Sequence, residues 1–206
     1  MRSRSARPPT PRIGRAGLTI AALAASALVV GSFALGRVVK LNLTASMPIG
    51  LYAVRPSASA IPRGAIVIAC PPPEAQRIGV ANGYLAPARG LVADSRCSSG
   101  SAPLLKYAVA FAGDEIDISA HGLSVNGHLL DPHTPSRIDR DGRALGAVPN
   151  GHYRLRKDQV WLYSPAIYSW DSRYFGPAKL GDVLGVAAPL WTSTPLVSLH
   201  APDHRT

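Results

Sequence analysis

Acidic residues are absent from the first forty positions of this 206-residue chain, whereas seven basic residues lie there. That segment carries +7 of the formal net charge of +10, so the rest of the chain carries only +3. A nucleic-acid-binding protein more usually carries its basic residues as a stripe on the folded domain. The charge distribution therefore argues against nucleic acid as a partner, because the basicity belongs to an N-terminal tail.

The sequence also lacks the signatures of several ligand sites. No Gly-rich phosphate-binding loop is present. Zinc sites need convergent His and Cys ligands, but His128 and His133 fall in a hairpin and a loop without cysteines beside them. The acidic run at 114–117 is typical of a turn entering a strand, with carboxylates on alternate faces. We therefore expect no metal site and no cofactor.

Charged residues are missing from 17–35 as well, a run of nineteen mostly apolar residues. At about 1.5 Å of helical rise per residue, such a run nearly crosses the roughly 30 Å hydrocarbon core of a membrane. We interpret it as a single transmembrane helix. Five arginines precede it, and only Arg37 and Lys40 follow it closely. The positive-inside rule thus predicts a basic cytoplasmic tail at 1–16 and an extracytoplasmic domain at 41–192.

A cleaved signal peptide is the competing interpretation of this run. The apolar core of a signal peptide usually spans about 7 to 15 residues before a small-residue cleavage site. The run is longer, and its Ala-x-Ala patterns, such as the one at 25–27, lie inside it. We favour an uncleaved anchor, which makes the lipid bilayer a partner and places the domain outside the cytoplasmic membrane. The polar end of the chain, 193–206, is expected to be flexible.

Cysteine is scarce, with only Cys70 and Cys97 in the chain. Export permits disulfide chemistry, and an even count is consistent with one bridge. The alternative is two unconnected thiols, one ending a strand and one in a loop. We favour a disulfide between Cys70 and Cys97.

After the predicted anchor, the patterns are mostly those of strands and turns. Short runs rich in β-forming residues are flanked by Gly, Pro or Asp at 50–54, 65–70, 106–111, 115–119 and 159–163. Asn126 and Gly127 supply the two positive-φ positions of a tight turn between apolar runs, which predicts a β-hairpin. One short helix is predicted from Pro73 to a stop at Gly79. The fold class is therefore mainly β, with a helical anchor.

Lys106 stands alone among apolar residues. It is one of only four lysines, and no other charged residue lies between Pro103 and Ala112. Burial of an amine in such a strand disfavours its charged form and lowers its pKa, so that the amine can act as a general base near neutral pH. The alternative is an edge-strand lysine whose stem packs while its head reaches water.

Ser46 is a candidate partner for this lysine. Pro48 fixes its own φ and favours an extended Met47, so Ser46 would lie on a constrained backbone. A serine hydroxyl needs a base to become a nucleophile, and lysine is one recognised base. Thr44 could point its hydroxyl to the same space and, with the Ser46 backbone N–H, form a two-donor oxyanion hole. As the alternative, Ser46 is an ordinary turn residue.

Four segments resemble the characteristic boxes of type I signal peptidases, in the same order and just after the predicted anchor. They are SMPIG, IPRGAIVIACPPP, LLKYAVAFAGDEI and YSWDSRYFGPAKLGDVLGVAAPLW, within about 43–191. These peptidases are membrane-anchored serine/lysine proteases with a β-sheet catalytic domain. The resemblance implies that Ser46 is the nucleophile, Lys106 the general base and Thr44 the side-chain donor of the oxyanion hole.

The last box carries supporting residues by the same resemblance. Ser169 matches a serine that helps to orient the lysine, and Asp171 and Arg173 match a charged pair that braces the site. A simple loop salt bridge is the plainer interpretation of this Asp and Arg, two residues apart. Both interpretations can hold, because residues behind an active site fix the rotamers of the catalytic ones.

Departures from housekeeping signal peptidases indicate a particular branch. WLYSPAIYSW stands where those enzymes carry Gly-Asp-Asn, Tyr107 follows Lys106 in place of arginine, and Ala65 replaces an acidic residue after Gly64. Together with SMPIGLY, DSRYFGP and the cysteine pair, these features resemble the conjugative-transfer, TraF-type peptidases. Members of that branch process pilin precursors, and some join the new ends into a ring.

The leading hypothesis is a membrane-bound serine endopeptidase that cleaves a membrane-tethered preprotein, a conjugative pilin precursor, on the periplasmic side of the cytoplasmic membrane. A second hypothesis keeps the acyl-enzyme but uses the substrate's own N-terminal amine as acceptor, which gives a circular product. A third is a non-enzymatic, membrane-anchored β-domain of a transfer apparatus. The sequence does not separate hydrolysis from cyclisation.

Overall fold

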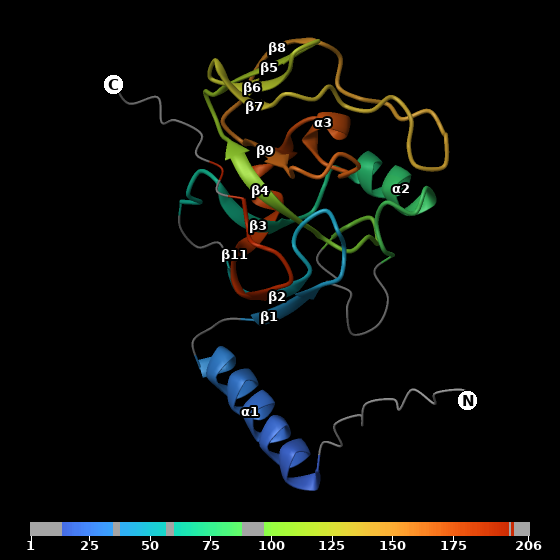
Figure 1. Cartoon of the computed structure of the whole chain (residues 1–206). Helices are drawn as coiled ribbons and strands as arrows, with labels where there is room; N and C mark the ends of the chain where they lie inside the picture. Colours follow the sequence, from blue (N-terminus) through green and yellow to red (C-terminus); the bar gives the residue numbers. More distant parts are fainter. Residues whose placement is uncertain (1–13, 35–37, 57–59, 88–96, 198, 200–206) are drawn as a thin grey trace, which may run out of the picture.

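The computed structural model describes residues 14–34, 38–56, 60–87, 97–197 and 199. Its first element is helix α1 (Arg15–Ala34), which covers most of the run predicted to span a membrane. Among the described residues, the structure contains no helix with the length and apolarity needed to cross a membrane. In Figure 1, α1 lies outside the domain, and the part of the domain nearest to it is strand β1 (Val38–Asn42). Arg37 and most of the predicted tail at 1–16 lie outside the described residues.

In the described part of the chain, seven antiparallel strands form the main sheet, in the order β1-β2-β11-β3-β4-β9-β10. The strands that follow β1 are β2 (Gly50–Pro56), β3 (Ala65–Ala69), β4 (Leu104–Ala110), β9 (Gln159–Tyr163), β10 (Ala178–Lys179) and β11 (Val183–Thr192). They are rich in the aliphatic and aromatic side chains that pack well on a pleated surface. Strand β11 pairs with β2 on one side and β3 on the other. It therefore joins the β1–β2 pair to the rest of the sheet.

A second antiparallel sheet has the order β7-β6-β5-β8. Its strands are β5 (Glu115–Ser119), β6 (Gly122–Val125), β7 (His128–Asp131) and β8 (Gly151–Arg154). Asn126 and Gly127 connect β6 to β7 with φ values of 54° and 77°, as the predicted hairpin requires. With two antiparallel sheets, the described domain is mainly β, and this part of the predicted fold class is confirmed.

Helix α2 (Pro73–Ala81) begins at the predicted proline but continues past Gly79. The prediction that Gly79 stops the helix is wrong, because this glycine serves close packing instead. A Cβ atom on Gly79 would lie 2.6 Å from the Cδ1 of Leu85 and 3.1 Å from the Nε1 of Trp170. Two shorter helices, α3 (Ser172–Phe175) and η2 (Leu180–Asp182), flank β10.

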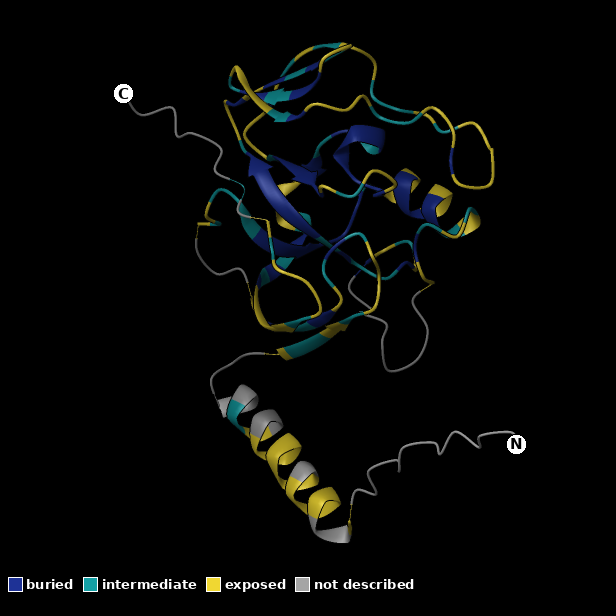
Figure 2. Cartoon of the chain, viewed as in Figure 1, coloured by how far each residue is buried: buried dark blue, intermediate teal, exposed yellow. Residues whose placement is uncertain are grey.

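The main core unites the two sheets. Its buried residues include Tyr52 and Trp161 of the main sheet and Ile116 and Leu123 of the second sheet. Figure 2 shows β4 buried along most of its length, whereas α1 is largely exposed. The expected flexible tail at 193–206 is described only at 193–197 and 199, where Leu196 and Leu199 pack against this core.

Candidate active site

The turn between β1 and β2 carries Ser46, and the side chain of Asn42 holds this turn together. The Asn42 amide nitrogen donates to the carbonyl oxygens of Thr44 at 3.0 Å, Met47 at 3.0 Å and Pro48 at 3.1 Å. The side chain of Met47 is 2% exposed, so it anchors the turn in the core. The carbonyls of an irregular turn are thereby satisfied without a regular ladder, which fixes the backbone that presents Ser46.

Thr44 lies beside the serine hydroxyl. Its Oγ1 donates to Asn42 Oδ1 at 2.8 Å and lies 3.3 Å from Ser46 Oγ. The Thr44 backbone N–H also donates to Asn42 Oδ1, at 3.2 Å. Rotation of the Thr44 side chain can therefore turn its hydroxyl toward the space next to Ser46, where the sequence predicts an oxyanion donor.

Lys106 reaches Ser46 from β4. Its side chain is only 2% exposed, and Nζ donates to Ser46 Oγ at 2.8 Å. Burial lowers the pKa of Lys106 to about 8; the negative charge of Asp171 opposes this shift, and the positive charge of Arg173 adds to it. A substantial fraction of these amines is neutral at mildly alkaline pH, so the lysine is available as a proton acceptor for the serine hydroxyl.

Asp171 and Arg173 form a buried ion pair behind the lysine. Arg173 Nε lies 2.9 Å from Asp171 Oδ1, and its Nη2 lies 2.8 Å from Asp171 Oδ2. A second carboxylate, that of Asp131 at the end of β7, accepts from Arg173 Nη1 at 2.7 Å. Arg173 also donates to the carbonyls of Ser164 and Ala166 at 2.9 Å each. The planar guanidinium thus uses its fork of donors to bind two carboxylates and the loop after β9.

Ser164 connects this ion pair to Ser46. Its backbone N–H donates to Asp171 Oδ2 at 3.2 Å, and its hydroxyl donates to the carbonyl oxygen of Ser46. The ion pair therefore fixes the position of Ser46 through one intervening serine. The sequence analysis missed Ser164, which lies 118 residues from Ser46, and its only local signal is a Ser-Pro step after a predicted strand.

A cavity of about 1150 Å³ adjoins the Ser46–Lys106 pair. Strand β1, the start of β4 and the loop segments 82–86 and 166–170 line most of it. In the described part of the sheet, β1 is an edge strand that pairs with β2 alone. The free edge of a strand can pair with an extended chain, so the cavity is suited to a peptide.

Comparison with known proteins identifies the family. The family described as "Signal peptidase, peptidase S26" matches residues 13–191. This chain belongs to the S26 signal peptidase family. The predicted family resemblance is thereby confirmed.

Among relatives of this S26 chain are three transfer proteins. It is 34% identical to the plasmid transfer protein TraF of Escherichia coli over 86% of the chain and 94% of that protein. It is 31% identical to the conjugal transfer protein TraF of Agrobacterium fabrum over 89% and 95% of the two chains. The probable conjugal transfer protein TraF of Sinorhizobium fredii is 34% identical over 89% and 90%. These matches confirm the predicted resemblance to the conjugative-transfer branch.

Ser169, the residue that the family resemblance assigns to orienting the lysine, is buried in this S26 chain. Its side chain is 1% exposed and lines the same cavity as Lys106. Its Oγ has no hydrogen-bond partner among the described residues. A bond from Ser169 to the lysine therefore stays a prediction, while Ser164 makes the contact that supports Ser46.

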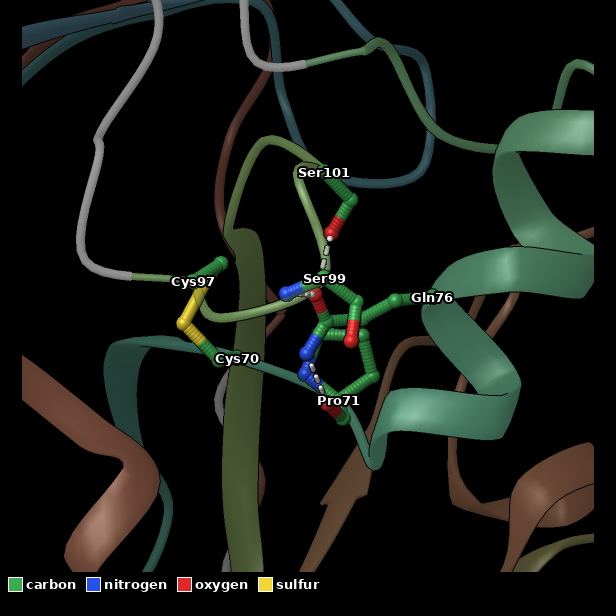
Figure 3. Close-up of a disulfide and its surroundings, with 6 residues drawn as sticks. All are labelled: Cys70, Pro71, Gln76, Cys97, Ser99 and Ser101. Carbon is green, nitrogen blue, oxygen red and sulfur yellow. Dashed lines mark hydrogen bonds between the residues drawn. A yellow bond between two sulfur atoms is a disulfide. The ribbon is translucent and has the colours of Figure 1, made fainter.

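A disulfide and a buried glutamine fix the segment that precedes β4 (Figure 3). Cys70 at the end of β3 is bonded to Cys97, with 5.5 Å between the two Cα atoms. Gln76 of α2 donates to the Pro71 carbonyl at 2.7 Å and accepts from the Ser99 backbone N–H at 3.1 Å. The segment that these contacts hold leads directly into β4, so they support the strand that carries the lysine.

Asp114, the first residue of the acidic run at 114–117, has a structural role. Asp114 accepts from Arg63 at 2.5 Å, from the Phe111 backbone N–H at 2.7 Å and from the Asn126 amide at 2.9 Å. These bonds fasten the turn between β4 and β5 to the hairpin turn. In the part of the chain that the structure describes, His, Cys, Asp and Glu form no group of three that could hold a metal ion.

Proposed function

We propose that this member of the S26 family is a serine endopeptidase that cleaves an exported preprotein with Ser46 and Lys106. The observation that carries the proposal is the 2.8 Å contact between the Lys106 amine and the Ser46 hydroxyl. The low pKa of the lysine, about 8, supports the same role. A neutral amine can remove the serine proton, and this removal makes the serine oxygen a nucleophile.

In the proposed reaction, Ser46 Oγ attacks the carbonyl carbon of the scissile peptide bond while its proton passes to Lys106 Nζ. Negative charge develops on the carbonyl oxygen, where the Thr44 hydroxyl and the Ser46 backbone N–H stabilise it. Thr44 exchanges its bond to Asn42 for this new bond. The lysine then gives the proton to the leaving amine, and water attacks the acyl-enzyme to regenerate Ser46.

The proposed substrate is a conjugative pilin precursor. The similarity to proteins named for plasmid and conjugal transfer supports this assignment. The large cavity beside the edge of β1 suits the extended conformation of a cleavage site. If the N-terminal amine of the substrate replaces water as the acceptor, the same acyl-enzyme gives a ring.

We also propose that α1 anchors the domain to the cytoplasmic membrane, with the site on the periplasmic side. Leu18, Ile20 and Leu23 of α1 are 60% to 71% exposed, although apolar side chains of helices are normally covered. The arginines before α1 favour a cytoplasmic N-terminus. Retention of the full chain in membranes after an alkaline wash supports this anchor, and its release into the supernatant argues against it.

The decisive experiment is processing of a pilin precursor by membranes that contain wild type, Ser46→Ala or Lys106→Ala at matched expression. Ser98→Ala and Lys157→Ala are the controls, since both residues are exposed. We expect product from wild type and the controls, and none from the two dyad variants. Intact mass then separates a linear product from a ring, which is one water lighter. Equal processing by all five proteins would leave a non-enzymatic transfer component as the better description.

A further inference from the structure

We propose that a second pocket beside Ser46 binds the substrate residues that follow the scissile bond and selects uncharged side chains there. This inference rests on the proposed peptidase function. The pocket, named here the leaving-side pocket, has a volume of about 380 Å³. Residues 45–49 of the serine turn, Tyr107, the Pro165–Ala166 step and residues of the segment 193–197 line it.

The leaving-side pocket and the main cavity meet at the nucleophile. Both are lined by Ala45, Ser46 and Ala166. A peptide that lies in the main cavity and passes over the Ser46 hydroxyl therefore continues into the leaving-side pocket. One site holds the part of the substrate that becomes the acyl group, and the other holds the part that leaves as the amine.

The residues that line the main cavity indicate which part of the substrate each site binds. The main cavity is the larger one, and it contains the Thr44 hydroxyl and the edge of β1. An extended chain before the scissile bond can pair with β1 up to the carbonyl that Ser46 attacks. The first residues after that bond then lie in the leaving-side pocket.

The lining of the leaving-side pocket determines its selectivity. None of the described residues that line it is acidic or basic; Ile49, Pro165 and Val197 offer apolar surface, and Ser193 and Thr194 offer hydroxyls. A charged substrate side chain would lose part of its hydration against this apolar surface and would gain no ionic partner, which is unfavourable. Small apolar side chains or hydroxyl-bearing side chains would meet no such penalty.

The wall made by 193–197 is held in place by the domain. The Ser193 backbone N–H donates to the Ile49 carbonyl at 2.8 Å. The backbone of Val197 forms a hydrogen bond with the hydroxyl of Tyr107, and Tyr107 is 4% exposed. Leu196 packs against the main core between these two contacts. The pocket is therefore preformed, and Tyr107, which follows the catalytic lysine, is one of the residues that form it.

The test uses the full chain in detergent and peptides that span the pilin cleavage site. These peptides carry Ala, Ser, Asp or Lys immediately after the scissile bond. We expect wild type to cleave the Ala and Ser peptides with kcat/KM at least tenfold above that of the Asp and Lys peptides. The exposed Thr194 tolerates replacement, so Thr194→Lys should raise the Asp-to-Ala ratio of kcat/KM at least tenfold.

Thr192→Lys is the matched control, because Thr192 is two residues away and lines neither site. It should leave the Asp-to-Ala ratio unchanged. An unchanged ratio in Thr194→Lys, or an equal rise in Thr192→Lys, overturns the inference while cleavage by wild type still upholds the peptidase function. If wild type cleaves no peptide and no precursor, both the function and the inference are overturned.

Discussion

The Lys106 amine lies 2.8 Å from the Ser46 hydroxyl, although 60 residues separate them in the chain. The two residues come from different parts of one sheet: Ser46 from the β1–β2 turn and Lys106 from β4. The proposed reaction depends on one desolvated amine, because the lysine is both the base and the source of the proton for the leaving group.

The proposed dyad predicts activity that rises with pH. The pKa of Lys106 is about 8, and only the amine without its extra proton can accept one from serine. We expect kcat/KM to fall about tenfold per pH unit below pH 7 and to level off above pH 9. Peptide cleavage by the full chain between pH 6 and 10 measures this, with Lys157→Ala giving the same profile. Full activity at pH 6 would contradict a lysine base.

Lys106→Met should unfold less readily than wild type at pH 7. The folded pKa, about 8, lies below the ordinary value of 10.5, so the unfolded chain holds the proton more tightly between these values. Wild-type stability therefore rises with pH from about 8 to 10.5, and below this window protonation of the buried amine costs about 3 kcal/mol. We expect a gain of about 1–3 kcal/mol for the variant at pH 7, reduced by the lost bond to Ser46. Denaturant titrations at pH 7 and 10.5 should show the difference shrinking.

Asn42→Ala should lower kcat much more than it changes KM. The variant loses the hydrogen bonds from Asn42 to three carbonyls of the β1–β2 turn. It also loses the Asn42 Oδ1 atom that accepts from the Thr44 hydroxyl. Misplacement of Ser46 by a fraction of an ångström is expected to slow acylation about ten- to a hundredfold. Asn150→Ala, at an exposed asparagine, is the control. A rise in KM at unchanged kcat would assign Asn42 to substrate binding instead.

Arg173→Met should destabilise the fold by about 3–5 kcal/mol, because it leaves two buried carboxylates without their cation. Those carboxylates belong to Asp171, which is 0% exposed, and Asp131, which is 4% exposed. Adding Asp131→Asn to Arg173→Met should restore part of the loss. Chemical denaturation of the two variants and of Asp131→Asn alone gives the coupling. Additive effects of the two substitutions would show that the carboxylate of Asp131 does not depend on Arg173.

Removal of the disulfide should lower the free energy of unfolding by about 3 kcal/mol. Cys70 and Cys97 are 27 residues apart, and a cross-link over a loop of that length restricts the unfolded chain by about this amount. The double variant Cys70→Ser/Cys97→Ser and reduced wild type should melt at the same temperature. Reductant should leave the melting of the double variant unchanged. Equal melting of oxidised and reduced wild type would contradict this assignment.

Local sequence patterns predicted those strands whose residue types are typical of β-structure over a few consecutive residues. The predictions at 115–119 and 159–163 coincide with β5 and β9, and Asn126-Gly127 adopts its expected backbone. Strand β11 was not predicted, because it contains Gly185 and Pro189 and both residue types are unfavourable in a central strand. The structure accommodates them locally: a bulge lies between Pro189 and Trp191, and a Cβ on Gly185 would meet the Arg55 carbonyl at 2.5 Å.

The candidate site could be predicted at residues that are unusual in their local sequence. It could not be predicted at residues whose role depends on long-range contacts. A lone lysine in an apolar strand and a serine before Met-Pro are visible in the sequence. The hydroxyl of Ser164 and the carboxylate of Asp131 have ordinary local surroundings in the sequence. Their contacts to Ser46 and Arg173 arise only when the sheets assemble, so no local pattern could reveal them.

Strand β11 lies between the β1–β2 pair, which holds Ser46, and the strands that carry Lys106. During synthesis, both residues leave the ribosome well before residues 183–192 do. Until those residues arrive, the two halves of the sheet lack the strand that sets their register. In the proposed mechanism, a half-made chain therefore carries Ser46 and Lys106 without the complete sheet that brings them together. The order of the strands would then delay the proposed proteolytic activity until almost the whole domain has been translated.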